Sequence, residues 1–203
     1  DHPLRARPRH PRDPRGRGQQ GGVHRERANL QAFGATPLLV GAVGDDAAGA
    51  RLTALLESQR ISSKGVVKAS GWPTIIKTRI IGQQQQMLRI DREEPEAGPS
   101  SAFEALLRHL DEALASAKAL IVSDYAKGLL DARLLTFVRQ RCAQAKIPWI
   151  VDPKPSHRAL YQGATLMTPN TKELAELTGL PAKTDEDMTA AALARSAEVA
   201  TWI

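Results

Sequence analysis

The sequence predicts an α/β fold in which helices flank a mostly parallel β-sheet. From residue 28 onward, short apolar runs of β-type composition alternate with segments of helical period, and this alternation is typical of βαβ units. Polar clusters stand directly after four of the apolar runs, where the carboxyl ends of parallel strands gather. Two consecutive strands interrupt the alternation, which predicts a small β excursion at about residues 72–92.

The predicted strands are short apolar runs bounded by Gly, Pro or polar residues. They are expected at 37–43, 75–81, 87–90, 119–122, 148–151 and 164–167. Helices are expected at 47–59, 100–117, 131–145, 171–178 and 184–200, with a short helical turn at 156–161. Leu52, Leu55 and Leu56 lie on one face of the first helix. The polar segment at 82–86 separates the second and third strands, which favours a hairpin.

The composition is that of one medium-sized soluble domain. The chain has 203 residues and a mass of 22.0 kDa, with 42% hydrophobic and 25% charged residues. No stretch approaches the roughly 20 apolar residues that cross a bilayer, and the basic N-terminus lacks the apolar segment of a signal peptide. We therefore expect a cytoplasmic protein with no membrane partner. The single Cys142 cannot form an internal disulfide.

Most of the net positive charge lies in the N-terminal arm, residues 1–27. Eight arginines and three acidic residues give this arm +5 of the formal net charge of +6. Its Pro, Arg and Gly content cannot bury enough apolar surface to offset the entropy of ordering, so we expect it to be disordered. It contains no aromatic residue on which a base could stack, and we expect no nucleic-acid partner.

The polar clusters that follow the strands are candidates for a ligand site. They occupy residues 44–46, 123–128, 152–154 and 168–170. In open α/β sheets, ligands bind beyond the carboxyl ends of the strands. Asp124 and Asp152 have the chemistry to hold sugar hydroxyls or the water shell of Mg²⁺, and Lys127 and Lys154 have the charge to neutralise phosphate. Turn and helix-cap chemistry is the alternative explanation of each cluster.

Two further sets of residues allow both a structural and a functional interpretation. Asn170 followed by Glu173 is a capping-box pattern, but the same helix N-terminus could face a nucleotide phosphate with Glu173 organising Mg²⁺ water. Strand alternation places the hairpin's charged residues on one side of each strand, either as a solvated face or as ligand contacts. These residues are Lys77, Arg79, Arg89 and Asp91. His109 and His157 show no metal-ligand pattern.

Six segments in order resemble the ribokinase-like sugar kinase family, from about residue 21 to the C-terminus. They lie at 74–79, 84–91, 123–128 (Ser-Asp-Tyr-Ala-Lys-Gly), 151–154 (Val-Asp-Pro-Lys), 161–165 and 168–173 (Thr-Pro-Asn-Thr-Lys-Glu). Within that family they are most similar to the heptose 7-phosphate kinases, the kinase half of bifunctional ADP-heptose synthesis proteins. The resemblance implies a ribokinase-like fold, incomplete here, with a small β lid over the sugar.

The resemblance also implies an activity and the residues that serve it. The activity is ATP- and Mg²⁺-dependent phosphorylation of D-glycero-D-manno-heptose 7-phosphate at its anomeric hydroxyl, toward ADP-heptose and the lipopolysaccharide core. Residues expected at the sugar phosphate are Lys77, Arg79, Gln85, Arg89, Asp91, Asp124, Lys127 and Asp152. Residues expected at the nucleotide are Lys154, Asn170, Thr171, Lys172 and Glu173, with Glu173 also serving Mg²⁺. Homodimers joined through the lid are expected as well.

The sequence departs from the family at the catalytic base. In the family this is an Asp that ends a Gly-Ala-Gly-Asp motif, and the printed sequence contains no such motif. Asp185 and Asp187 have no neighbouring glycine and are interpreted as the start of a helix. We therefore assign no catalytic residue and expect the chain to be inactive alone. A different ribokinase-like sugar kinase fragment and a noncatalytic nucleotide-binding module are the alternatives.

A second departure is at the front of the domain, taken as residues 28–203. The family's Asn-Val-Ala step is replaced by Val-His-Arg-Glu-Arg at residues 23–27. Codons for His-Arg-Glu-Arg-Ala, read one base later, can encode Ile-Ala-Asn-Val. We hypothesise that the reading frame is displaced upstream of about residue 28. We also expect exposed sheet edges and poor expression. Absence of the family's opening strand from every frame of the DNA would contradict the frame hypothesis.

Overall fold

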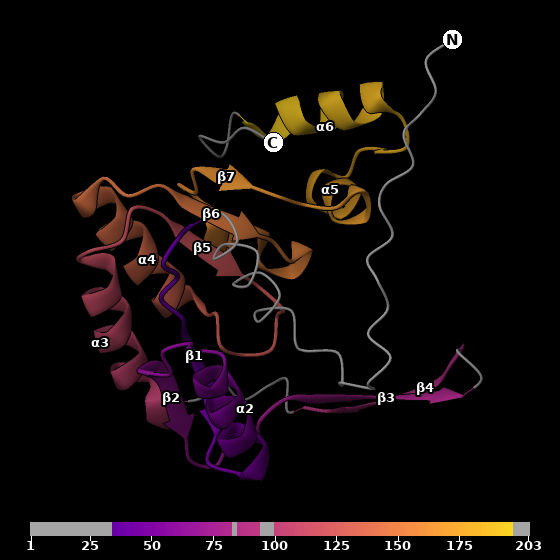
Figure 1. The fold of residues 1–203 in the computed structure, drawn as a ribbon. Helices are drawn as coiled ribbons and strands as arrows, with labels where there is room; N and C mark the ends of the chain where they lie inside the picture. The colour runs from indigo at the N-terminus through magenta and orange to yellow at the C-terminus, as the bar shows by residue number, and fades with distance from the viewer. Residues whose placement is uncertain (1–33, 83–84, 94–99, 197–203) are drawn as a thin grey trace. The chain divides into compact units, whose positions relative to one another are not determined.

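The computed structural model describes residues 34–82, 85–93 and 100–196, and its strands pair in three groups (Figure 1). The strands are β1 (Val40–Gly44), β2 (Gly65–Ala69), β3 (Ile76–Gly82), β4 (Gln85–Arg92), β5 (Leu120–Ser123), β6 (Trp149–Asp152) and β7 (Leu166–Met167). The helices are α2 (Ala47–Ser58), α3 (Phe103–Leu114), α4 (Ala132–Ala145), α5 (Thr171–Thr178) and α6 (Asp185–Ser196). Short 3₁₀ helices are η1 (Ser100–Ala102) and η2 (Pro155–Tyr161).

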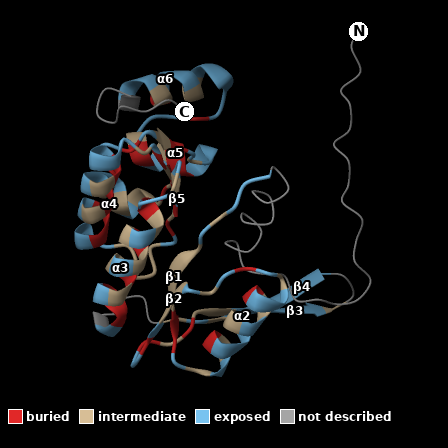
Figure 2. Cartoon of the chain, turned by 60° about the vertical axis from the view of Figure 1, so that its left-hand side comes forward, coloured by how far each residue is buried: buried red, intermediate tan, exposed pale blue. Residues whose placement is uncertain are grey.

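The largest sheet is parallel and has the order β5-β6-β7. Val122, Val151 and Met167 form a register row that is buried in the main core. The apolar sides of α3 and α4 complete that core, and Figure 2 shows the buried positions gathered on one side of each helix. Fully burying a large apolar side chain stabilises the fold by about 1.5–3 kcal/mol, so this core holds the sheet in place.

A second parallel pair joins β1 to β2, and β2 was not predicted. Lys68 interrupts its apolar run, so the local sequence lacks the continuous pattern of a buried strand. The strand exists because it pairs with β1, in a register that runs from Val40 opposite Gly65 to Gly44 opposite Ala69. This pairing is non-local, and therefore no short window of sequence reports it.

The predicted hairpin is confirmed. Strands β3 and β4 are antiparallel, with Lys77 opposite Asp91 and Arg79 opposite Arg89. A register shift lies between Ile80 and Ile81, and the residues at 83–84 lie outside the described chain. In Figure 1 the two strands form a long ribbon that extends away from the other strands, beyond α2.

The chain divides into two units, residues 1–37 and residues 38–203. The predicted arm at 1–27 and the predicted domain boundary at 28 fall outside the described residues, as does the predicted end of the last helix at 200. Among the residues that the structure describes, no helix is long and apolar enough to cross a membrane.

Candidate active site

Three of the four predicted polar clusters meet at the carboxyl edge of the sheet β5-β6-β7. The strands are parallel and in register, with Ser123 opposite Asp152, so the segments that follow them leave the sheet on the same side. The backbone N–H of Asp124 donates to the carbonyl oxygen of Asp152 at 3.1 Å. This edge brings together residues of the second, third and fourth clusters.

The fourth predicted cluster, at Gly44–Asp46, ends the separate pair β1-β2 and anchors the hairpin instead. Asp46 accepts from the N–H of Gly49 at 2.8 Å, which caps α2, and from the N–H and hydroxyl of Thr74 at 3.0 and 2.7 Å. These bonds lower the pKa of Asp46 from 3.8 to about 2. A Cβ on Gly44 would lie 2.4 Å from the Trp72 carbonyl oxygen, so only glycine allows this approach. This cluster therefore follows a different hydrogen-bonded sheet from the other three, and the expectation that all four line one site stays a prediction.

Asp124 is an internal acceptor beneath the edge. Its side chain is only 1% exposed. One carboxylate oxygen accepts from the N–H of Ala126 at 2.6 Å, and the other accepts from the Tyr161 hydroxyl at 2.6 Å and contacts His157 Nδ1 at 2.7 Å. The structure thus gives this carboxylate three protein partners, two of which, Tyr161 and His157, reach it from η2. Its expected contact with a sugar hydroxyl or Mg²⁺ water stays a prediction.

The N-terminus of α5 carries both features that the sequence left open. Asn170 accepts from the N–H of Glu173 at 3.0 Å, and Glu173 accepts from the N–H of Asn170 at 3.1 Å, so the capping box is confirmed. Glu173 also forms an ion pair with Lys154, which joins the third cluster to the fourth and raises the pKa of Lys154. Thr171 and Lys172 are exposed in the first turn of the helix.

Asp152 lies among these groups with a raised pKa. Burial is the main cause, and the neighbouring charges of Glu173 and Asp124 raise it further while Lys154 lowers it. The described residues contain no group of three or more His, Cys, Asp or Glu side chains arranged to hold a metal ion. Asp152 and Glu173 are two carboxylates at this edge, and Mg²⁺ commonly keeps several waters and takes only one or two protein carboxylates, so their chemistry is compatible with that ion.

The charged face of the hairpin connects to this edge through Glu93. Lys77 lies 3.0 Å from Asp91 and 3.2 Å from Glu93, and Lys127 lies 2.6 Å from the other oxygen of Glu93. Arg89 pairs with Asp91 at 3.0 Å. The Lys127 and Lys77 ammonium groups lower the pKa of Glu93, so this carboxylate is ionised at neutral pH.

Gln85 lies far along the hairpin from Lys77, Asp91 and Glu93. It lies opposite Gly82 at the end of the hairpin, whereas Lys77 and Asp91 lie at its base. Five residues of extended strand separate Gly82 from Lys77, which is roughly 17 Å at about 3.3 Å per residue. Arg79 and Arg89 lie between these two ends on the charged face.

Residues 26–202 match the sequence model of a protein family described as "pfkB family carbohydrate kinase". The chain belongs to the pfkB family of carbohydrate kinases.

Relatives within the family are longer than this chain. It is 42% identical over 181 residues to the bifunctional protein HldE of Azorhizobium caulinodans, a match that covers 89% of this chain and 37% of that protein. It is 41% identical over 157 residues to HldE of Koribacter versatilis, covering 77% of this chain and 32% of the relative. The chain therefore spans about a third of the length of these relatives.

Solved structures confirm the ribokinase-like α/β fold. A possible 1-phosphofructokinase of Thermotoga maritima superposes with a TM-score of 0.71 at 15% identity, covering 97% of this chain and 63% of that chain. Arabidopsis thaliana ribokinase, solved with ribose and ATP, gives a TM-score of 0.57 at 20% identity, covering 79% and 52%. At these identities the likeness concerns the fold alone.

Sequence reasoning missed several residues of this pfkB-family site. Glu93 continues the alternation of Arg89 and Asp91 by one further step, so the same period would have found it. Tyr161 and His157 contact Asp124 from more than 30 residues away, and no local pattern reports such a contact. Thr74 has the same character, since its partner Asp46 lies 28 residues earlier.

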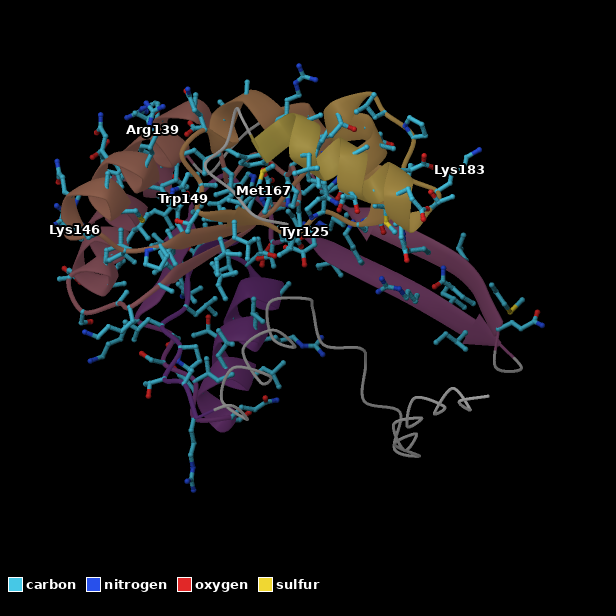
Figure 3. All side chains as sticks on the ribbon, turned by 90° about the horizontal axis from the view of Figure 1, so that it is seen from above. Tyr125, Arg139, Lys146, Trp149, Met167 and Lys183 are labelled. Carbon is cyan, nitrogen blue, oxygen red and sulfur yellow. The ribbon has the colours of Figure 1, made fainter. Side chains whose placement is uncertain are left out.

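A pocket of about 430 Å³ lies at the opposite edge of the sheet and is separate from these residues. It is lined by Arg139, Cys142, Ala143, Lys146, Ile147, Pro148, Trp149, Gly163 and Thr165. Trp149 begins β6, whereas the polar clusters follow the strand ends. In Figure 3 the labelled Arg139, Lys146 and Trp149 lie to the left, and Tyr125, which follows β5, lies to the right toward the hairpin.

Proposed function

We propose that this chain carries the substrate-binding part of a heptose 7-phosphate kinase. The full reaction transfers the γ-phosphoryl group of ATP to the anomeric hydroxyl of D-glycero-D-manno-heptose 7-phosphate, toward ADP-heptose and the lipopolysaccharide core. Membership of the pfkB family and 42% identity to an HldE protein support this class of reaction. The observation that carries the proposal is the meeting of Lys77 and Lys127, from two separate motifs, around one carboxylate.

The two lysines supply the charge that a sugar phosphate needs. Each is about one-third exposed or less, at 34% and 27% of the side chain, so their charges are only partly screened by water. Both lysines donate hydrogen bonds to the carboxylate of Glu93, which is negatively charged like the phosphate that they would bind. A bound phosphate would take the place of Glu93 and be neutralised from the hairpin on one side and from the loop after β5 on the other.

The nucleotide is proposed to bind at the N-terminus of α5. The dipole of α5 favours phosphate at its N-terminus, and Lys154, which pairs with Glu173, lies beside this helix end. Mg²⁺ enters with ATP and neutralises charge on its phosphates. The waters of that ion would be oriented by Glu173 and Asp152. The nucleotide would thus bind at the segments that follow β6 and β7, and the sugar phosphate at the segment that follows the neighbouring β5.

No described carboxylate is proposed as the catalytic base. Asp187 accepts from the N–H groups of Lys183 and Thr184, both at 3.2 Å, and its own N–H donates to the Thr184 hydroxyl at 3.1 Å. This reciprocal cap supports the interpretation of Asp185 and Asp187 as a helix start. We propose that turnover requires the aspartate of the family's Gly-Ala-Gly-Asp motif, and that this chain binds substrates without transferring phosphate.

Calorimetry tests the substrate assignment. The purified chain is titrated with D-glycero-D-manno-heptose 7-phosphate, with ribose 5-phosphate and with fructose 6-phosphate. The heptose phosphate should bind most tightly, and Lys127→Met should weaken it about tenfold or more, since a charge-assisted contact contributes roughly 1.5–3 kcal/mol. Lys146→Met, at the opposite edge of the sheet, is the matched control and should leave binding unchanged. Tighter binding of another sugar phosphate would favour a different ribokinase-like kinase.

A noncatalytic nucleotide-binding module is the second candidate, favoured by the complete cap and Lys154–Glu173 pair at α5. If the chain is such a module, it should bind MgATP and should not bind any sugar phosphate. Titration of both ligands into the same preparation separates the two candidates. Metal-dependent release of ADP from ATP and the heptose phosphate would contradict the absence of turnover.

A further inference from the structure

The carboxylate of Asp124 lies between two loops that each carry one lysine of the proposed site. The loop after β5 contains Lys127, and the loop after β6 contains Lys154. Because β5 and β6 are adjacent, parallel and in register, the two loops start side by side. The contacts of Asp124 reach into both of them.

On the β5 side, Asp124 holds the loop in an unusual conformation. Ala126 has a φ of +49°, in the left-handed region that is costly for a residue with a Cβ. Its N–H donates to Asp124 Oδ1 at 2.6 Å, a side-chain bond two residues long that stabilises this turn. Lys127 is the next residue, and its ammonium reaches Glu93. The direction of Lys127 therefore depends on the Asp124 carboxylate.

On the β6 side, the connection runs through the hydroxyl of Tyr161. This hydroxyl donates to Asp124 Oδ2 at 2.6 Å and accepts from the N–H of Lys154 at 2.9 Å. Tyr161 is fully buried, and burial together with the Asp124 charge raises its pKa, so the hydroxyl keeps its proton. One O–H group thus links the carboxylate that shapes the first loop to the backbone of the lysine in the second.

We propose that Tyr161 is a positioning residue that couples Lys127 to Lys154, so that the sugar-phosphate side and the nucleotide side of the site are set together. The inference rests on the proposed function. Phosphoryl transfer depends mainly on the placement of charges around two substrates, so a rigid link between their cations has a direct use. His157 supports the same arrangement, since its Nδ1 contacts Asp124 at 2.7 Å and its backbone N–H donates to the carbonyl oxygen of Lys154 at 2.9 Å.

Tyr161→Phe tests the coupling because it removes only the bridging oxygen. It should weaken the binding of MgADP and of the heptose phosphate by about tenfold each, whereas Lys154→Met weakens only MgADP and Lys127→Met only the sugar phosphate. In the double variant Tyr161→Phe/Lys154→Met, MgADP should bind less than about twofold more weakly than in Lys154→Met alone. Thermal unfolding of Tyr161→Phe and of the unaltered chain separates lost stability from lost coupling.

These variants test the coupling through Tyr161 separately from the proposed function on which it rests. If both lysine variants weaken binding but Tyr161→Phe does not, or if its effects simply multiply with theirs, the coupling is wrong and the proposed function stands. If neither lysine variant weakens binding, both are wrong.

A measurement on the unaltered chain covers the case in which Tyr161→Phe does not fold. In ¹⁵N NMR spectra, MgADP alone should shift the amides of Ala126 and Lys127, and the heptose phosphate alone should shift the amide of Lys154. Shifts confined to the loop that binds each ligand would overturn the coupling.

Discussion

Glu93 holds two of the lysines that are proposed to bind the sugar phosphate. Its carboxylate bridges Lys77 and Lys127 at 3.2 and 2.6 Å. These side chains are partly exposed, so water and salt screen their ion pairs, and a dianionic phosphate can displace the carboxylate. Glu93 therefore competes with the substrate for the same two charges.

Replacing Glu93 with Gln should tighten sugar-phosphate binding. The variant removes the competing charge and keeps the shape of the side chain, so affinity for the heptose phosphate should rise about three- to tenfold in calorimetry at pH 7. Glu112→Gln, on the exposed side of α3, is the control for the change in net charge. Weaker binding by Glu93→Gln would show that Glu93 orients the lysines instead of competing.

Asp46 should make stability depend on pH in a defined window. Its pKa is lowered from 3.8 to about 2 in the folded chain by bonds from Gly49 and Thr74, so the ionised carboxylate favours the folded state. That contribution is complete above about pH 4 and is lost as the pH falls toward 2. Urea midpoints of the unaltered chain and of Asp46→Asn should therefore converge between pH 4 and 2. Parallel curves across this window would contradict the assignment.

Helix α5 combines a structural cap with a proposed phosphate site, and one substitution separates them. Asn170→Ala removes the acceptor for the Glu173 N–H and should lower the free energy of unfolding by about 1 kcal/mol. Asn170→Asp keeps an acceptor and should unfold like the unaltered chain, yet its negative charge should weaken MgATP binding about tenfold. Urea unfolding and calorimetry on both variants measure the two effects. Unchanged MgATP binding in Asn170→Asp would show that phosphate does not approach this helix end.

Elements were predictable where the signal is local. Helix α5 has the predicted bounds because Asn170, Glu173 and Gly179 mark its ends within a few residues. Helix α3 ends at Leu114 instead of 117, where its side-chain period ends without a marked stop signal. Strand β2 depends on pairing with β1, and a local window does not contain that partner.

The same distinction applies to the site. The clusters at the sheet edge were expected from the residues that follow each strand, and three of them gather there. The burial of Asp124 and its bond from Tyr161, 37 residues away, depend on how η2 packs beneath the edge. The internal role of that carboxylate was therefore beyond what the motif alone could predict.

For the whole molecule, the hairpin presents an apolar face opposite its charged one. Ile80, Leu88 and Ile90 are 44–52% exposed, with Ile80 directly opposite Leu88 in the register. Exposed apolar patches of this kind favour association. They support the expected homodimer through the lid, which stays a prediction.

Sedimentation velocity tests the dimer. The chain should sediment as a dimer at micromolar concentration, and Leu88→Arg should shift it to monomer because charge on the apolar face prevents close packing. Leu193→Arg, at an exposed position of α6, should leave the dimer intact. A monomer in the unaltered chain, or dissociation by both variants, would contradict assembly through the hairpin.

Different kinds of contact hold the hairpin where the chain enters it and where the chain leaves it. On the side where the chain enters β3, the N–H and hydroxyl of Thr74 donate at 3.0 and 2.7 Å to Asp46, the N-cap of α2. On the side where the chain leaves β4, the fastening is the ion pair of Glu93 with Lys127. Salt screens exposed ion pairs but has little effect on hydrogen bonds of this kind. The hairpin is consequently held by hydrogen bonds at its entry and by an ion pair at its exit, and only the second contact should weaken as ionic strength rises or a competing anion binds.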